Sequence, residues 1–264
     1  MTQSFHGMPC WFELGTSDID GAAAFYGKVL GWTVGGSEMP EFDYHLARMD
    51  GEMVAGVMGL EQQPPGTPPN WLLYVAVDSA DDTARQAAAR GGTVLKEPAD
   101  IPGTGRFAVL ADPQGAVFGI LQPDMSQMSE AEQARAAENQ PFDQKKPGHG
   151  HWLELMSTDP KAGFAFYAEL FGWTRGEAMP MGEAGDYQLF RKDGADIGGM
   201  MGLGGAPMPV WLVYFGVPGA EAATAAIREA GGKVRHGPME VPGGGFIVVA
   251  TDPQGAWFAV VGGK

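Results

Sequence analysis

The feature that most constrains how this chain folds is an internal repeat, in which the second half of the sequence restates the first at a nearly constant spacing. The segment Cys10–Asp18 is matched by His151–Asp159, 141 positions later. The turn sequence Asp112–Ala116 returns unchanged as Asp252–Ala256. Self-similarity over this length is typical of a duplicated structural unit, so the sequence predicts two copies of one fold.

The length fits this duplication. The 264 residues are enough for two domains, since a domain takes roughly 100–200 residues. Residues 123–149 fall outside the repeat and are polar, which is typical of a linker, and a short helix is expected within them near Ser129–Glu138. We therefore predict a first domain over residues 1–122, a polar linker over 123–149 and a second domain over 150–264.

Each half alternates between helical and strand-like periodicity. Apolar residues at helical spacing, with a capping residue before them and a glycine after them, predict helices over 18–30 and 159–172. Second helices are predicted at about 80–90 and 220–230, each before a Gly-Gly pair. The strand-like runs of the first half are Tyr44–Met49, Met53–Leu60, Trp71–Val77, Thr93–Lys96, Arg106–Leu110 and Val117–Leu121.

The charge balance excludes two classes of partner. The chain has 17 Lys and Arg against 32 Asp and Glu, a formal net charge of −15, and such a surface repels phosphate backbones and anionic lipids. The sequence contains no apolar run of the ~20 residues that span a bilayer and shows no secretory leader pattern. Cys10 is its one cysteine, so an intrachain disulfide cannot form. We expect a cytoplasmic protein, monomeric or homodimeric, whose partner is a small molecule rather than nucleic acid or membrane.

A set of motifs, present in both halves, resembles a known family. In the first half they are Trp11-Phe-Glu-Leu, Phe25-Tyr26, Leu30-Gly-Trp and Asp112-Pro-Gln-Gly-x-x-Phe118. This pattern resembles the glyoxalase, bleomycin-resistance and extradiol-dioxygenase superfamily, also called vicinal oxygen chelate proteins. The resemblance implies an α+β fold in which two βαβββ modules form one cup-shaped mixed sheet with helices outside. The chain would then hold four modules in two cups.

The resemblance also implies a divalent metal, held by His or Gln on the first strands of the modules and by Glu near the end of the last strand. The positions that match are Trp11, Trp152, Leu72, Leu212, Gly119 and Ala259. The strand from which a further ligand would come, Met53–Leu60, contains no His, Asp or Glu. A divalent ion needs several such donors converging on it, so we predict no bound metal and no cofactor.

Strand alternation indicates which side chains line the cups. If Phe12 and Leu14 pack on the helix, Trp11 and Glu13 point the other way. The predicted ligand-binding residues are Trp11, Met58, Tyr74, Trp152, Met201 and Tyr214, and the predicted catalytic carboxylates are Glu13 and Glu154. Burial in an apolar cup would raise the pKa of such a carboxylate and suit it to acid–base chemistry. The structural alternative is that the tryptophans and methionines fill a core and the glutamates are satisfied by a Tyr hydroxyl or an Arg.

Three functions remain open from the sequence. The first is a protein that binds a small, largely apolar or aromatic molecule in its cups without the family metal. The alternative is a glyoxalase-like lyase or a dioxygenase-type enzyme, using an unpredicted divalent metal or the acid–base pair Glu13 and Glu154. A third is a scaffold with closed cups. Cys10 and His151 each lie one residue before an expected ligand position, so a β-bulge would turn them inward and bring metal binding back.

Overall fold

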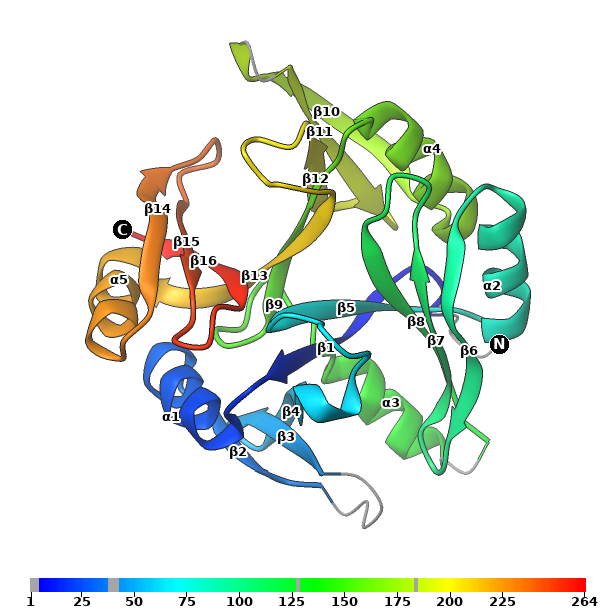
Figure 1. Cartoon of the computed structure of the whole chain (residues 1–264), viewed down its shortest axis with the longest axis horizontal. Coiled ribbons are helices and arrows are strands. Elements are labelled where there is room, and N and C mark those ends of the chain that lie inside the picture. The colour runs from blue at the N-terminus through cyan, green and yellow to red at the C-terminus, as the bar shows by residue number, and fades with distance from the viewer. Residues whose placement is uncertain (1–4, 38–42, 127–128, 183–184) are drawn as a thin grey trace. The chain divides into compact units, whose positions relative to one another are not determined.

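The computed structural model describes residues 5–37, 43–126, 129–182 and 185–264, and four βαβββ modules account for most of them (Figure 1). Module 1 consists of β1 (Pro9–Thr16), α1 (Ile19–Leu30), β2 (Thr33–Gly36), β3 (Tyr44–Met49) and β4 (Glu52–Gly59). Module 2 consists of β5 (Asn70–Ala76), α2 (Ala80–Ala89), β6 (Thr93–Ile101), β7 (Gly105–Ala111) and β8 (Val117–Pro123). Module 3 consists of β9 (Gly150–Met156), α4 (Pro160–Phe171), β10 (Thr174–Pro180), β11 (Asp186–Lys192) and β12 (Ala195–Met201). Module 4 consists of β13 (Val210–Gly219), α5 (Ala220–Glu229), β14 (Lys233–Glu240), β15 (Phe246–Thr251) and β16 (Trp257–Gly263).

The strands form two eight-stranded mixed sheets, which confirms the predicted α+β class. Their strand orders are β2-β3-β4-β1-β5-β8-β7-β6 and β10-β11-β12-β9-β13-β16-β15-β14. Within each module the first strand runs parallel to the last, as β1 does to β4, while the remaining neighbours are antiparallel. The sequence missed β2, because its four residues end in Gly35-Gly36 and show no alternating pattern.

The helices begin and end where the sequence predicts. Asp18 caps α1 by accepting a hydrogen bond from Gly21 N at 2.9 Å, and Gly31 ends it in the left-handed conformation at φ +78°. Asp159 and Gly172 do the same for α4. The expected linker helix is α3 (Glu130–Glu138), which Ser129 and Glu132 start with a capping box. In the described residues no helix is long and apolar enough to cross a bilayer.

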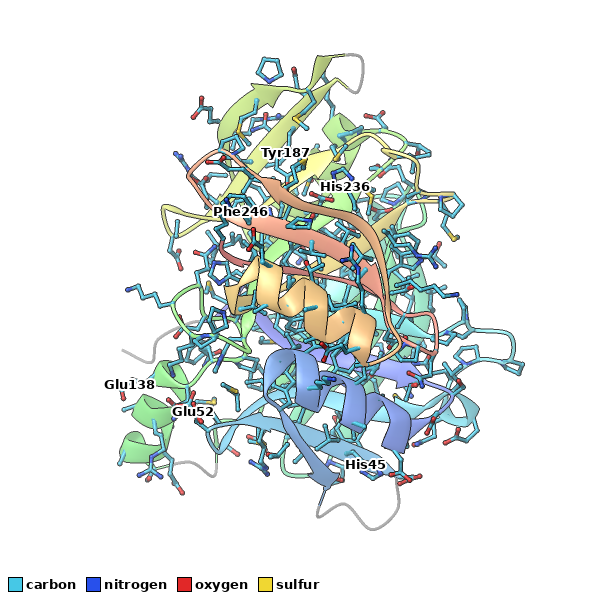
Figure 2. All side chains as sticks on the ribbon, turned by 90° about the vertical axis from the view of Figure 1, so that its left-hand side faces the viewer. His45, Glu52, Glu138, Tyr187, His236 and Phe246 are labelled. Carbon is cyan, nitrogen blue, oxygen red and sulfur yellow. The ribbon has the colours of Figure 1, made fainter. Side chains whose placement is uncertain are left out.

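The chain divides into two compact units, each built from modules of both halves. Unit 1 comprises Met1–Cys10, Leu73–Asn139 and Leu153–Trp211, and unit 2 comprises Trp11–Leu72, Gln140–Trp152 and Leu212–Lys264. In unit 1, α2 packs against α4. In unit 2, α1 packs against α5, and the two helices lie one above the other in Figure 2. Each unit therefore joins one module from the first half to one from the second.

A buried chain of hydrogen bonds joins the two modules within each unit. In unit 2, Trp71 Nε1 donates to Tyr26 Oη at 2.9 Å, and Tyr26 Oη donates to Asp252 Oδ2 at 3.0 Å. The other carboxylate oxygen of Asp252 accepts the backbone N–H groups of residues 254, 255 and 256 at 2.7–3.0 Å. This chain connects the helix of module 1 to the β15–β16 turn of module 4.

Unit 1 repeats this chain with the matching residues. Trp211 Nε1 donates to Tyr167 Oη at 2.9 Å, and Tyr167 Oη donates to Asp112 Oδ2 at 3.1 Å. Asp112 Oδ1 accepts the backbone N–H groups of residues 114, 115 and 116 of its own turn at 2.8–2.9 Å. The Asp-Pro-Gln-Gly hairpin turn of the repeat is thus confirmed. Its aspartate also accepts a hydrogen bond from a tyrosine of another module.

Candidate functional site

One face of module 1 gathers most of the predicted site residues of the first half. We call it the first-half face, and it comprises Trp11, Glu13 and Gly15 of β1, Gly56 and Met58 of β4, and Tyr44 of β3. The register sets Glu13 beside Gly56, and Met58 beside both Gly15 and Tyr44. Phe12 and Leu14, which alternate with these residues on β1, are fully buried on the opposite side. The predicted orientation of β1 is therefore confirmed.

Three polar groups of the first-half face form a chain. Trp11 Nε1 donates to Tyr44 Oη at 2.8 Å, and Tyr44 Oη donates to Glu13 Oε2 at 3.1 Å. The end of the Tyr44 ring lies over Gly56, since a Cβ added there would overlap its hydroxyl. Burial and the nearby charge of Glu13 raise the Tyr44 pKa well above its ordinary value. Tyr44 therefore stays a neutral donor to the carboxylate.

Module 3 presents an equivalent face. The second-half face comprises Glu154 and Met156 of β9, Gly199 and Met201 of β12, and Tyr187 of β11, which is labelled in Figure 2. All five residues lie in unit 1, whereas Trp152 belongs to unit 2, and a ligand role for Trp152 stays a prediction. Glu154 pairs with Gly199, and Met156 with Met201. The Tyr187 ring covers Gly199, since an added Cβ there would overlap it. The repeat therefore preserves the arrangement of tyrosine over glycine.

The two remaining predicted ligand contacts, Tyr74 and Tyr214, occupy matching places in modules 2 and 4. Tyr74 pairs with Gly119 and is 5% exposed, and its ring covers that glycine. Tyr214 pairs with Ala259 and is 3% exposed. Tyr74 belongs to unit 1, whereas Trp11, Glu13 and Met58 belong to unit 2. A ligand role for these two tyrosines stays a prediction.

The residues at the family's metal-ligand positions do not fit a divalent ion. The Trp11 indole is a donor only and is used by Tyr44. At Gly119, the space of a ligand side chain is filled by the Tyr74 ring. Leu72, Leu212 and Ala259 carry no donor atoms. Across the described ranges, no group of three His, Cys, Asp or Glu side chains is placed to hold a metal.

Cys10 and His151 have other surroundings. The Cys10 thiol donates to Tyr74 O at 3.5 Å, and burial raises the Cys10 pKa, which disfavours the thiolate. His151 Nδ1 is buried without a hydrogen-bond partner in the part of the chain described, and burial lowers the pKa of this ring. His149 is tied to Glu52 Oε2 at 3.3 Å, beside Lys146 at 2.8 Å from the same oxygen. The two histidines therefore differ in their surroundings: His149 contacts a carboxylate and a lysine shares that carboxylate, whereas the His151 ring is buried.

Comparison with known proteins agrees with this architecture. The model of the Glyoxalase/Bleomycin resistance protein/Dioxygenase superfamily matches residues 10–120 and 149–260. A Mycobacterium tuberculosis protein named "Putative glyoxylase CFP32" is 32% identical over 97% of this chain and 94% of its own length. The anthracycline biosynthesis protein DnrV of Streptomyces peucetius is 30% identical over 99% of this chain and 95% of its own length. The chain belongs to the glyoxalase/bleomycin resistance protein/dioxygenase superfamily.

Solved structures share the fold at low sequence identity. The Mn(II)-bound glyoxalase from Novosphingobium aromaticivorans superimposes with a TM-score of 0.66 at 16% identity, covering 98% of this chain and 83% of that one. The 2,3-dioxygenase LapB from Pseudomonas sp. KL28 gives a TM-score of 0.66 at 15% identity, covering 99% and 93%. At this identity the likeness extends to the fold alone.

Sequence reasoning missed Tyr44 and Tyr187 as members of the two faces. Both were visible as the repeated pair Asp-Tyr, at residues 43–44 and 186–187. Their strands also read as ordinary half-buried β-strands, for which tyrosine is a common residue. The signal that separates them is the glycine on the neighbouring strand, Gly56 or Gly199, which makes room for the ring. Which glycine lies beside each tyrosine is known only once the strand register is known.

Proposed function

We propose that the first-half face binds a small, largely apolar or aromatic molecule without a bound metal, and that the second-half face is its diverged counterpart. The observation that carries the proposal is the hydrogen-bonded chain from Trp11 through Tyr44 to Glu13. The chain fixes an indole and a phenol in orientation on a half-buried strand face, beside the flexible thioether of Met58. Aromatic and methionine walls with a few placed polar groups are typical of small-molecule sites.

Burial supports a binding role for these side chains. Trp11, Glu13 and Met58 are each only half-buried, whereas Phe12 and Leu14 on the opposite side are fully buried. A bound ring would cover apolar surface at roughly 25 cal/mol per Å². Glu13, which accepts from Tyr44, places a carboxylate beside the aromatic side chains of this face. An aromatic molecule with a hydroxyl or amine suits this arrangement.

The proposal is tested by titrating the protein with a panel of naphthalene and anthracene derivatives, with tryptophan fluorescence as the readout. We expect Trp11→Ala to weaken binding at least 10-fold and Glu13→Gln to weaken binding of hydroxylated members about 3-fold. Glu221→Gln, an exposed position on α5, is the matched control and should leave binding unchanged. A panel without any saturable quenching in the wild type would overturn the proposal.

Lyase chemistry is the second candidate, favoured by the similarity to a protein named as a glyoxylase. In that case Glu13, with Tyr44 beside it at 3.1 Å, would act as the acid–base group. Elemental analysis of the purified protein separates the two candidates. Stoichiometric zinc, nickel, manganese or iron that survives dialysis would overturn the metal-free proposal and favour the enzyme.

A further inference from the structure

The first-half and second-half faces differ in kind at one position. The alternate positions of β1 carry Trp11, Glu13 and then Gly15, whereas the matching positions of β9 carry Trp152, Glu154 and then Met156. The missing side chain of Gly15 is replaced by a side chain from elsewhere, because a Cβ added there would overlap the Gln63 amide nitrogen. The Gln63 amide therefore lies on the first-half face, one step along β1 from Glu13.

Gln63 is held in this place by a second amide. Asn70 Nδ2 donates to Gln63 Oε1 at 2.9 Å and to Pro68 O at 2.9 Å. The Gln63 backbone N–H is bonded to Leu60 O at 3.0 Å, which closes the short 3₁₀ turn Leu60–Gln62. The side-chain oxygen of Gln63, Oε1, therefore already accepts the hydrogen bond from Asn70. Within the described residues its nitrogen donates no hydrogen bond, so the amide hydrogens are available to a ligand.

The second half lacks counterparts of Gly15, Gln63 and Asn70. Asn70, directly before Trp71, corresponds to Val210, directly before Trp211. The connecting segment shortens from residues 61–70 to residues 204–210, and the shorter segment contains no Asn or Gln. Met156 stands at the position that matches Gly15. Loss of the glycine, the glutamine and the asparagine together indicates that they act as one unit.

We infer that Gln63 determines the specificity of the first-half face, by donating a hydrogen bond to an acceptor oxygen, such as a carbonyl, carried by an aromatic ligand. Asn70 is the positioning residue, since it fixes the amide so that nitrogen and not oxygen faces the site. The second-half face, with Met156, accepts the ring without this requirement. The inference rests on the proposed function, and it names the ligand class for one face.

The test uses two probes that differ only in the acceptor, 2-acetylnaphthalene and 2-ethylnaphthalene. Binding at the first-half face is followed by the indole N–H resonance of Trp11, assigned by its loss in Trp11→Phe. In the wild type we expect the acetyl probe to bind roughly 3- to 10-fold more tightly, the contribution of one hydrogen bond. In Gln63→Leu the ratio should fall to about 1, with the affinity for the ethyl probe unchanged.

Two further variants complete the design. Gln62→Leu makes the same substitution at the neighbouring residue, whose amide donates to Asp43 O at 2.9 Å, and should keep the preference. Gly15→Met copies the second half and should abolish the preference by displacing Gln63. Equal affinity for both probes in the wild type, or a preference that survives Gln63→Leu, would overturn the inference and leave the proposed function standing. If neither probe shifts the Trp11 resonance, both fail.

Discussion

The molecule uses one hydrogen-bonded sequence, tryptophan to tyrosine to carboxylate, in two different settings. In the interior of unit 2 it runs from Trp71 through Tyr26 to Asp252, with lengths of 2.9 and 3.0 Å. On the first-half face it runs from Trp11 through Tyr44 to Glu13, with lengths of 2.8 and 3.1 Å. The donors, the acceptors and the distances are nearly the same.

The difference lies in what surrounds the carboxylate. Asp252 is 2% exposed, and one of its oxygens accepts three backbone N–H groups of its own turn. Glu13 is half-buried on β1, beside other half-buried side chains. A buried carboxylate held by fixed donors stabilises the fold, because removing it leaves those donors unpaired. The same groups on the first-half face are only half-buried.

The largest expected effect breaks the interior chain. Replacing Asp252 by alanine leaves the Tyr26 hydroxyl and three turn N–H groups without their acceptor, and should lower the free energy of unfolding by about 3 kcal/mol. Asp112→Ala should do the same in unit 1, where the bonds match. Urea unfolding followed by circular dichroism measures both. Asp20→Ala, at an exposed position of α1, is the control and should change stability by less than about 0.5 kcal/mol.

A smaller effect separates the two settings directly. Tyr26→Phe leaves Trp71 Nε1 and Asp252 Oδ2 buried without a partner, which should cost about 2 kcal/mol. Tyr44→Phe removes the same link from the first-half face, where Trp11 and Glu13 are half-buried rather than fully buried, and should cost less than about 1 kcal/mol. Urea unfolding of the two variants side by side measures the difference. Equal losses would mean that the face is as closed to water as the interior.

Most of the fold was predictable from the sequence because the repeat shows each element twice. The helix that starts at Asp18 and stops at Gly31 has a copy from Asp159 to Gly172, and two agreeing copies fix the boundaries. The last strands were predicted through the Asp-Pro-Gln-Gly turn, whose geometry is local. Strand β2 was missed, because its pairing with β3 and not its own four residues makes it a strand.

The candidate site was predictable only in part. Alternation along β1 placed Trp11 and Glu13 on one face, since that depends on neighbours in the sequence. Tyr44 and Gln63 joined that face through contacts with Gly56 and Gly15, and these depend on register and on the path of a loop. A glycine in a strand shows that something approaches closely. The sequence does not state which side chain approaches.

The smallest expected effect is the pH dependence of the interior carboxylates. Burial raises the pKa of Asp252 above its ordinary value of 3.8, and outweighs the hydrogen bonds that lower it. The folded chain then holds this proton more tightly than the unfolded chain. The free energy of unfolding should therefore fall as pH rises from 3.8 through the native pKa, by at most about 1.4 kcal/mol per unit, and then level off.

The measurement compares the wild type with Asp252→Asn across that range, because subtraction removes every other titrating group. As pH rises from 3.8, the wild type should lose stability relative to the variant, and the difference should become constant above the native pKa. Asp112→Asn should repeat this in unit 1, since burial also raises the pKa of Asp112. A wild type that gains stability relative to its variant would mean that the turn N–H groups outweigh burial. The interior carboxylates would then be stabilised as anions.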